Sequence, residues 1–336
     1  MNRAYRPRAG VRKVDINGAS HHQQGGLDTG VLIGVLTMDT HDRSGPLKDR
    51  AVAQAADLTQ VCRALGLEEN AAAQFLALFD ECLADYSALS IDPSTGALGI
   101  MTRGSGQAHA FRIVKFMEQA RQPEAAIEQF LGRVRHFDAE NIALKAEIDR
   151  RGVREVTTYV RQEIERKVAH ACLADAGVNV ASVGLMEAVV EALDSATVCA
   201  VATSVTVSGD AVEKIYLASP DAALDWGRVR LVGQLVGLSD LDWSPIDARR
   251  STLSISGMEL SLGFRGGRAL PGVTLAFRSV SPEVVAGLLG SRTERETADR
   301  IRVLWDRTVH DEVRIRIVPG GPMGLKTCAV RAQEVG

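Results

Sequence analysis

The chain has 336 residues, which is enough for one large domain or two ordinary ones. Hydrophobic residues make up 46% of it and charged residues 24%, and the formal net charge of −3 gives no support for nucleic acid or an anionic membrane as a partner, so we expect no nucleic-acid partner. No apolar run reaches the ~20 residues needed to span a bilayer, and the five cysteines, which show no paired spacing, favour reduced thiols in a soluble, cytoplasmic protein.

Residues 1–45 differ in composition from the rest of the chain. This segment begins with MNRAYRPRAGVRKVDINGASHHQQGG, which is rich in arginine, glycine and polar residues and lacks a hydrophobic period. Such a composition predicts a flexible N-terminal arm, with one short strand at 31–38. We expect residues 46–336 to form a single domain.

Helical patterns follow this arm. Apolar residues recur at three and four spacing in PLKDRAVAQAADLTQVCRALG, which ends at Gly66, and again in NAAAQFLALFDECLADY. In SALSIDPSTGALGIMTRG, a turn signal separates two short apolar runs, which predicts a hairpin. From Ala108 to about Ala176 the chain is again interpreted as helical, with a break at Pro123 and an end at Gly177.

The last 150 residues show the clearest order. A helix in GLMEAVVEALD precedes a hairpin over Thr197–Asp221, which turns at Ser208, Gly209 and Asp210. A helix is then predicted at 220–236, followed by strands near 241–246, 251–256, 260–264 and 273–278. A helix at 282–305 leads to a last hairpin in EVRIRIVPGGPMGLKTCAVRA, with its turn at 319–322. Strands joined by tight turns pair antiparallel, so the pattern predicts an α+β fold of repeated αββα units.

In each late strand an apolar face alternates with a polar one. Ile215 and Leu217, for example, alternate with Lys214 and Tyr216. Helices need apolar surface, so they should cover the first face and leave the polar, cationic face without a helix. An open sheet would expose that face to water, which is the commoner arrangement of antiparallel sheets. A sheet closed into a barrel would instead turn it inward and create a cationic lumen.

One hairpin carries a family resemblance. The segment CAVATSVTVSGDAVEKIYLAS combines a strand, an S-G-D turn and a strand that bears a basic residue and a tyrosine, and LVGLSDLDWSPIDARRSTLSISG looks like a second such repeat. Together with the αββα order, which extends roughly from Asp80 to Ala332, this hairpin resembles the ABBA-type prenyltransferases, which are soluble aromatic and peptide prenyltransferases. The resemblance implies a closed antiparallel β-barrel that is surrounded by helices and filled by the substrate site.

The resemblance also implies a chemistry. The lumen would hold an isoprenoid diphosphate, and the prenyl group would pass to an aromatic or peptide acceptor. The residues of the polar face are the candidates for the diphosphate contacts, namely Lys214, Tyr216, Arg278, Arg314, Arg316 and Lys326. A carboxylate would take the proton of the acceptor, for which Asp240, Asp242 and Asp247 are the candidates. Mg²⁺ could help to neutralise the diphosphate.

Two other functions stay open at this point. The same barrel could hold an apolar or anionic ligand without catalysis, or an open α+β sheet could dimerise as an interaction protein. The glycine-rich segment GFRGGRALPG at 263–272 could cradle a phosphate, although no helix follows it at once, which favours a flexible hairpin loop. Stabilisation by an isoprenoid diphosphate would separate the barrel from the interaction protein.

Overall fold

A computed structural model of the chain describes residues 58–332, except 64, 93–94, 138–140, 195, 219–224, 249, 252, 255–257, 279, 281–309 and 322. All of the described residues belong to one compact unit. The N-terminal arm expected at 1–45 and the helix expected at 282–305 lie outside the described residues.

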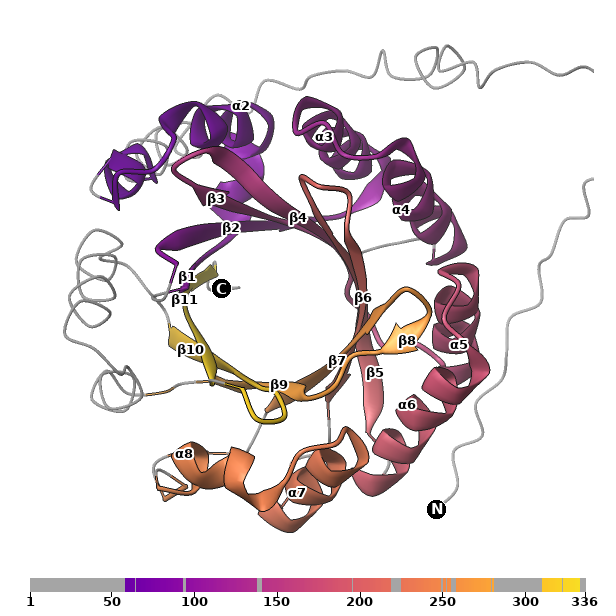
Figure 1. Cartoon of the computed structure of the whole chain (residues 1–336). Helices are drawn as coiled ribbons and strands as arrows, with labels where there is room; N and C mark the ends of the chain where they lie inside the picture. Colours follow the sequence, from indigo (N-terminus) through magenta and orange to yellow (C-terminus); the bar gives the residue numbers. More distant parts are fainter. Residues whose placement is uncertain are drawn as a thin grey trace, which may run out of the picture. The chain divides into compact units, whose positions relative to one another are not determined.

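Ten strands form a closed antiparallel barrel (Figure 1). Within the described part of the chain each strand of the ring has two neighbours, because β11 pairs with β1 and β7 pairs with both β6 and β9. The short strand β8 (Arg268–Ala269) pairs only with the end of β7. The strands of the ring are β1 (Tyr86–Asp92), β2 (Ala97–Gly104), β3 (Ile142–Asp149), β4 (Gly152–Val160), β5 (Thr197–Thr206), β6 (Ala211–Ala218), β7 (Glu259–Arg265), β9 (Val273–Arg278), β10 (His310–Ile317) and β11 (Gly324–Ala332).

Helices cover the outside of the barrel (Figure 1). They follow the hairpins in the αββα order that the sequence predicts. Their bounds are α2 (Glu69–Asp85), α3 (Gly106–Gln119), α4 (Glu124–Phe137), α5 (Arg166–Asp175), α6 (Val180–Ala192), α7 (Trp226–Leu235), the 3₁₀ helix η3 (Asp240–Trp243) and α8 (Ser244–Asp247). None of the described helices combines the length and the apolar character that crossing a membrane requires.

The hydrophobic core lies between the barrel and the helices. Ile215 and Leu217 of β6 are buried in it together with Phe116 of α3, whereas Lys214 and Tyr216 line the lumen. The alternation of faces read from the sequence is therefore confirmed. The alternative of an open sheet is wrong, because every strand of the ring is paired along both sides. The polar face of the sheet therefore points into the barrel. Burial of each aliphatic side chain against the helices contributes about 1.5–3 kcal/mol.

The helical interpretation of the range from Ala108 to Ala176 is wrong in its centre. Helices α3, α4 and α5 lie within this range, but β3 and β4 form a hairpin between α4 and α5. The alternation is visible in IALKAEID, where Lys145 and Glu147 lie on the inward face. The turn of this hairpin ends at Gly152, whose φ of 112° is readily adopted only by glycine. Charged residues at three and four spacing favoured a helix locally, and the pairing with β2 and β5 overrides that preference.

The strands expected near 241–246 and 251–256 are also wrong. The first range forms η3 and α8, because the Asp242 side chain caps the backbone N–H of Ser239 and Pro245 opens the short helix that follows. The described residues of the second range are not in a strand. The strands expected at 260–264 and 273–278 are confirmed as β7 and β9.

His109 of α3 links the stability of the fold to pH. Its ring is buried 5.7 Å from that of Phe79, measured between centroids, and a Cβ added at Gly104 would lie 2.6 Å from it. Burial, and then the charge of Arg112, lowers the pKa of His109 from 6.5 to about 4. The folded pKa is below the unfolded one, so the unfolded state binds more protons and stability is lost as the pH falls through this window.

We expect the free energy of unfolding to decrease by about 2 kcal/mol between about pH 7 and about pH 5 because of this histidine. Urea denaturation of the wild type and of His109→Leu across that range measures the effect. The variant should lose this component of the pH dependence. Equal slopes in the two proteins would contradict the assignment.

Candidate functional site in the barrel lumen

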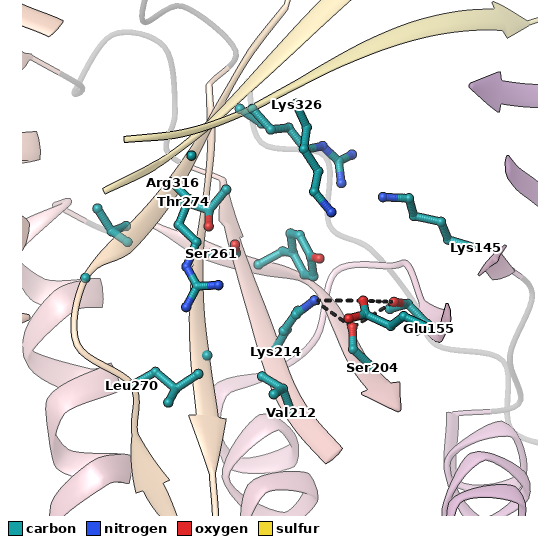
Figure 2. A pocket seen from close by; sticks show the side chains of 18 of the residues that line it. Lys145, Glu155, Ser204, Val212, Lys214, Ser261, Leu270, Thr274, Arg316 and Lys326 are labelled. Carbon is teal, nitrogen blue, oxygen red and sulfur yellow. Dashed lines mark hydrogen bonds and ion pairs between the residues drawn. The ribbon is translucent and has the colours of Figure 1, made fainter. Parts of the chain in front are cut away.

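The lumen contains a cavity of about 370 Å³. Figure 2 shows Lys145, Lys214 and Lys326 directed into it from different strands. Cationic side chains outnumber carboxylates in the wall, with Lys145, Arg154, Lys214, Arg265, Arg314, Arg316 and Lys326 against Asp92, Glu147, Glu155 and Glu259. The cavity is therefore positively charged and suits an anionic ligand.

Lys145 of β3 and Lys326 of β11 share the carboxylate of Glu147. Their Nζ atoms lie 2.8 Å and 2.5 Å from the same oxygen, Oε1. Burial alone would raise the pKa of Glu147, but the two lysines hold it far below its usual range. Burial and the charge of Lys145 lower the pKa of Lys326. Burial alone would also lower the pKa of Lys145, but Glu147 and Tyr159 together raise it above the ordinary value. Two cations on one anion leave this cluster with net positive charge.

Gly99 of β2 makes room for Lys145. A Cβ added at Gly99 would lie 2.4 Å from Cε of Lys145 and 2.3 Å from Oγ of Ser90. Glu147, Gly99 and Ser90 occupy one row across β3, β2 and β1. The small residues in this row let the lysine lie across β2, which allows side chains from β3 and β11 to meet although two strands separate them.

Lys214 of β6 lies in a second cluster (Figure 2). Its Nζ donates to Oγ of Ser204 at 2.6 Å and lies 3.9 Å from Oε1 of Glu155. Ser204 Oγ is in turn 2.7 Å from Oγ1 of Thr157. The side chains of Lys214 and Glu155 remain 28% and 23% exposed, so both can be reached by a ligand in the cavity.

Further ion pairs lie where β4 and β9 end and where β7 and β10 begin. Nη2 of Arg161 lies 2.8 Å from Oε1 of Glu259, which Arg278 also contacts. Nε of Arg314 donates to Glu312 at 2.6 Å. Burial alone would lower the pKa of Arg314, but Glu312, Cys328 and the two tyrosines together raise it well above the ordinary value. The two contacts of Glu259 connect β7 to β9 and to the residue after β4.

Tyr159 and Tyr216 are the aromatic residues of the described cavity wall. Their ring centroids lie 5.8 Å apart. Burial, and then Tyr216, raises the pKa of Tyr159 to about 12, so its hydroxyl stays protonated at neutral pH. Small and flexible side chains pack with the pair on the inward face, namely Ala88, Met101, Ala143, Ala200 and Ala202.

The structure brings five of the six expected ligand contacts together. The residues that line the cavity are Lys214, Tyr216, Arg314, Arg316 and Lys326. Arg278 is on the same face of β9, but it pairs with Glu259 at a half-exposed position and does not line the cavity. The glycine-rich segment 263–272 forms the β7–β9 connection, and its residues Gly263, Arg265, Leu270, Pro271 and Gly272 belong to the wall.

The three expected catalytic aspartates do not lie in the lumen. Asp240 and Asp247 pair with Arg230 of α7, and Asp242 accepts the backbone N–H of Gly320 while it caps η3. None of them lines the cavity. Their segment was interpreted as a strand of the barrel and is instead a pair of short helices outside it, so they are not placed to take a proton from a substrate in the lumen.

Several residues of the site were missed because β3 and β4 were interpreted as helix. These are Lys145, Glu147, Arg154, Glu155, Thr157 and Tyr159. The signal that could have found them is the period-two alternation of IALKAEID and VREVTTYV on either side of a short turn that ends in glycine.

The described wall of the lumen offers no carboxylate cluster for the Mg²⁺ ion that the family resemblance implies. Among the described residues no three His, Cys, Asp or Glu side chains are grouped to hold a metal ion. The glutamates that line the cavity each lie beside lysine or arginine side chains rather than beside one another.

No family model matches the sequence, and neither does any curated protein. Solved structures do match the fold. A 6-dimethylallyltryptophan synthase from Micromonospora olivasterospora, solved with DMASPP and Trp, is 13% identical, with a TM-score of 0.60 over 83% of this chain and 96% of that one. NotF, solved with brevianamide F and DMSPP, is 12% identical, with a TM-score of 0.59 over 89% and 98% of the two chains.

A third match is the prenyltransferase PriB, solved with L-tryptophan and dimethylallyl thiolodiphosphate. It is 13% identical, with a TM-score of 0.53 over 83% of this chain and 95% of that one. The chain therefore has the fold of the ABBA-type aromatic prenyltransferases, which confirms the resemblance found in the sequence. Identities this low establish the fold and leave the activity to be argued from the site.

Proposed function

We propose that this protein transfers a prenyl group from an isoprenoid diphosphate to an aromatic or peptide acceptor inside the barrel. The observation that carries the proposal is the cationic cavity within a closed barrel. Lysine and arginine side chains supply charge-assisted hydrogen bonds to a diphosphate. The enclosing wall limits access of water to a reactive prenyl cation. The fold shared with prenyltransferases that were solved with donor compounds also supports this proposal.

In this reaction the bond between the prenyl carbon and the diphosphate oxygen breaks, and the acceptor forms the new bond to that carbon. Negative charge grows on the departing diphosphate, so Lys145, Lys214 and Lys326 stabilise it more in the transition state than in the ground state. The rings of Tyr159 and Tyr216 offer π-faces to the prenyl cation.

Glu155 is our candidate for the base that removes the proton from the acceptor. Its side chain is 23% exposed, against 7% for Glu147 and 6% for Glu259. Glu147 is held by two lysines and Glu259 by two arginines, so both carboxylates are already engaged by cationic partners. Glu155 lies 3.9 Å from one cation, Lys214, and accepts a hydrogen bond from the Thr157 hydroxyl at 3.2 Å, so it is the least tightly paired of the three glutamates and the one best placed to accept a proton.

The test is incubation with dimethylallyl, geranyl and farnesyl diphosphates and a panel of tryptophan, tryptophan-containing cyclic dipeptides and phenolic acceptors. Mass spectrometry should detect an acceptor heavier by one prenyl group and inorganic pyrophosphate in equal amount. Absence of product with every donor and acceptor, in a protein that thermal shift shows to bind pyrophosphate, would reject the transferase.

A second function is favoured by one specific observation. The described wall offers two tyrosines as its aromatic residues, and the carboxylates of Glu147 and Glu259 are each held by two cations. Such a lumen suits non-catalytic binding of a small anionic ligand in the same cavity. Pyrophosphate binding without any prenyl transfer would favour this function.

Lys326 makes ligand binding sensitive to alkaline pH. Burial and the charge of Lys145 lower its pKa from the ordinary 10.5. As the pH rises through this lowered pKa, Lys326 loses its charge and pyrophosphate should bind more weakly, at a lower pH than an ordinary lysine would cause. Titration calorimetry across the alkaline range measures this decline. Lys326→Arg, which stays charged, should remove it, and an unchanged decline in that variant would contradict the assignment.

A further inference from the structure

Glu147 occupies the place in the lumen where two lysines from distant strands meet. We propose that Glu147 is an internal counter-ion that occupies the diphosphate-binding site of the ligand-free protein, and that a bound diphosphate displaces it from Lys145 and Lys326. The carboxylate thereby limits the affinity of the site. The identity of the ligand rests on the proposed function, whereas the displacement rests on the geometry of the cluster.

The contacts of Glu147 have the form of an anion site that is already filled. Both lysines donate to one oxygen, Oε1, at 2.8 Å and 2.5 Å. A phosphate oxygen accepts the same charge-assisted hydrogen bonds as a carboxylate oxygen. The two side chains and the carboxylate all line the 370 Å³ cavity, so a ligand that enters it reaches the same ammonium groups.

The barrel wall brings the ends of Lys145 and Lys326 together. Lys145 and Lys326 belong to β3 and β11, which are separated in the ring by β2 and β1. Gly99 of β2 gives Lys145 the room to lie across that strand, because a Cβ there would come within 2.4 Å of Cε. The two ammonium groups are therefore held together by the wall itself, and both face the cavity.

The charges explain why a counter-ion is needed and why it opposes the ligand. Two buried ammonium groups close to each other destabilise each other, and burial together with the charge of Lys145 lowers the pKa of Lys326. Glu147 relieves this repulsion while the lumen is empty. A diphosphate brings more negative charge than one carboxylate, so it replaces Glu147 as the partner of the lysines. The displaced carboxylate stays in the lumen, because it is anchored to β3, and it repels the ligand.

The experiment is titration calorimetry of the wild type, Glu147→Gln and Glu147→Asp with inorganic pyrophosphate at fixed ionic strength. Glu147→Gln keeps the shape and removes the charge, so the dissociation constant should fall by about tenfold. Glu147→Asp keeps the charge but is one methylene shorter and cannot bridge both lysines as well, so it should bind with intermediate affinity. If Glu147→Gln does not fold, as circular dichroism would reveal, the Glu147→Asp result decides.

The matched control is Glu118→Gln, which removes the same charge from an exposed pair with Lys115 on α3. It should bind pyrophosphate like the wild type. Unchanged or weaker binding by Glu147→Gln would overturn the inference, because Glu147 would then position the lysines rather than compete with the ligand. An equal gain in Glu118→Gln would overturn it as well, since net charge alone would explain the effect.

The two proposals can fail separately in this design. Tighter pyrophosphate binding by Glu147→Gln, in a protein that transfers no prenyl group, would uphold the counter-ion and reject the transferase. If the wild type transfers a prenyl group but Glu147→Gln binds pyrophosphate no more tightly, the transferase is upheld and the counter-ion is rejected. Binding of pyrophosphate by none of the proteins would reject both.

Discussion

Lys214→Met is expected to lower kcat/KM for prenyl transfer by about 10²–10³-fold, because removal of one preorganised contact to a developing anion has an effect of this size. Lys214 projects from β6 into the cavity and lies beside Ser204 and Glu155. Its side chain is 28% exposed, so its loss should have little effect on the free energy of unfolding. Steady-state kinetics and urea denaturation of the same preparation measure the two quantities.

Two further variants complete this experiment. Lys115→Met removes a lysine from the exposed surface of α3, where it pairs with Glu118, and should leave kcat/KM unchanged. Lys214→Arg keeps the charge and should retain part of the activity. If Lys214→Met shows wild-type kinetics, Lys214 and its strand β6 do not contribute to the donor site. A loss of stability that matches the loss of activity would assign the residue a structural role instead.

Gly99→Ala is expected to weaken pyrophosphate binding by about 10–100-fold, the effect of losing one hydrogen bond that involves a charged group. The new Cβ would lie 2.4 Å from Cε of Lys145 and would push that side chain out of its position across β2. The lysine end is flexible and the added methyl group is small, so the effect on stability should stay near 1 kcal/mol. Titration calorimetry with pyrophosphate and urea denaturation provide the measurements.

The double variant Ser90→Ala/Gly99→Ala is the control for this substitution. It removes the hydroxyl that an added Cβ would meet at 2.3 Å but keeps the overlap with Lys145. Binding should remain weak in the double variant if displacement of the lysine is the cause. Recovery of wild-type affinity would assign the effect to Ser90, and undiminished binding in Gly99→Ala alone would contradict the role of Lys145.

The late part of the fold could be predicted because its local signals agree. In β6, β9 and β10 period two, β-branched residues and turn residues all favour hairpins, and these elements are confirmed. In β3 and β4 the signals conflict, because charged residues such as Arg150, Arg151 and Glu155 also fit a solvated helix. Closure depends on the pairing of β1 with β11 and of β6 with β7, which no local pattern encodes.

The candidate site was predictable to the extent that it follows from alternation. Once Ile215 and Ile315 are assigned to the helix side, Lys214 and Arg314 must face the lumen. The partners of these cations could not be predicted, because Glu147 meets Lys326 only after the barrel closes. The aspartates near 240–247 were misassigned because a short acidic segment with alternating apolar residues resembles a strand until its capping contacts are known.

The most direct test of the cationic lumen is a crystal structure of the protein soaked with dimethylallyl thiolodiphosphate, a donor analogue that reacts poorly. We expect density for the diphosphate inside the barrel, with its oxygens on Lys145, Lys214 and Lys326 and with Glu147 turned away from the lysines. Diphosphate density on the outer surface, with Glu147 still bridging Lys145 and Lys326, would contradict the account.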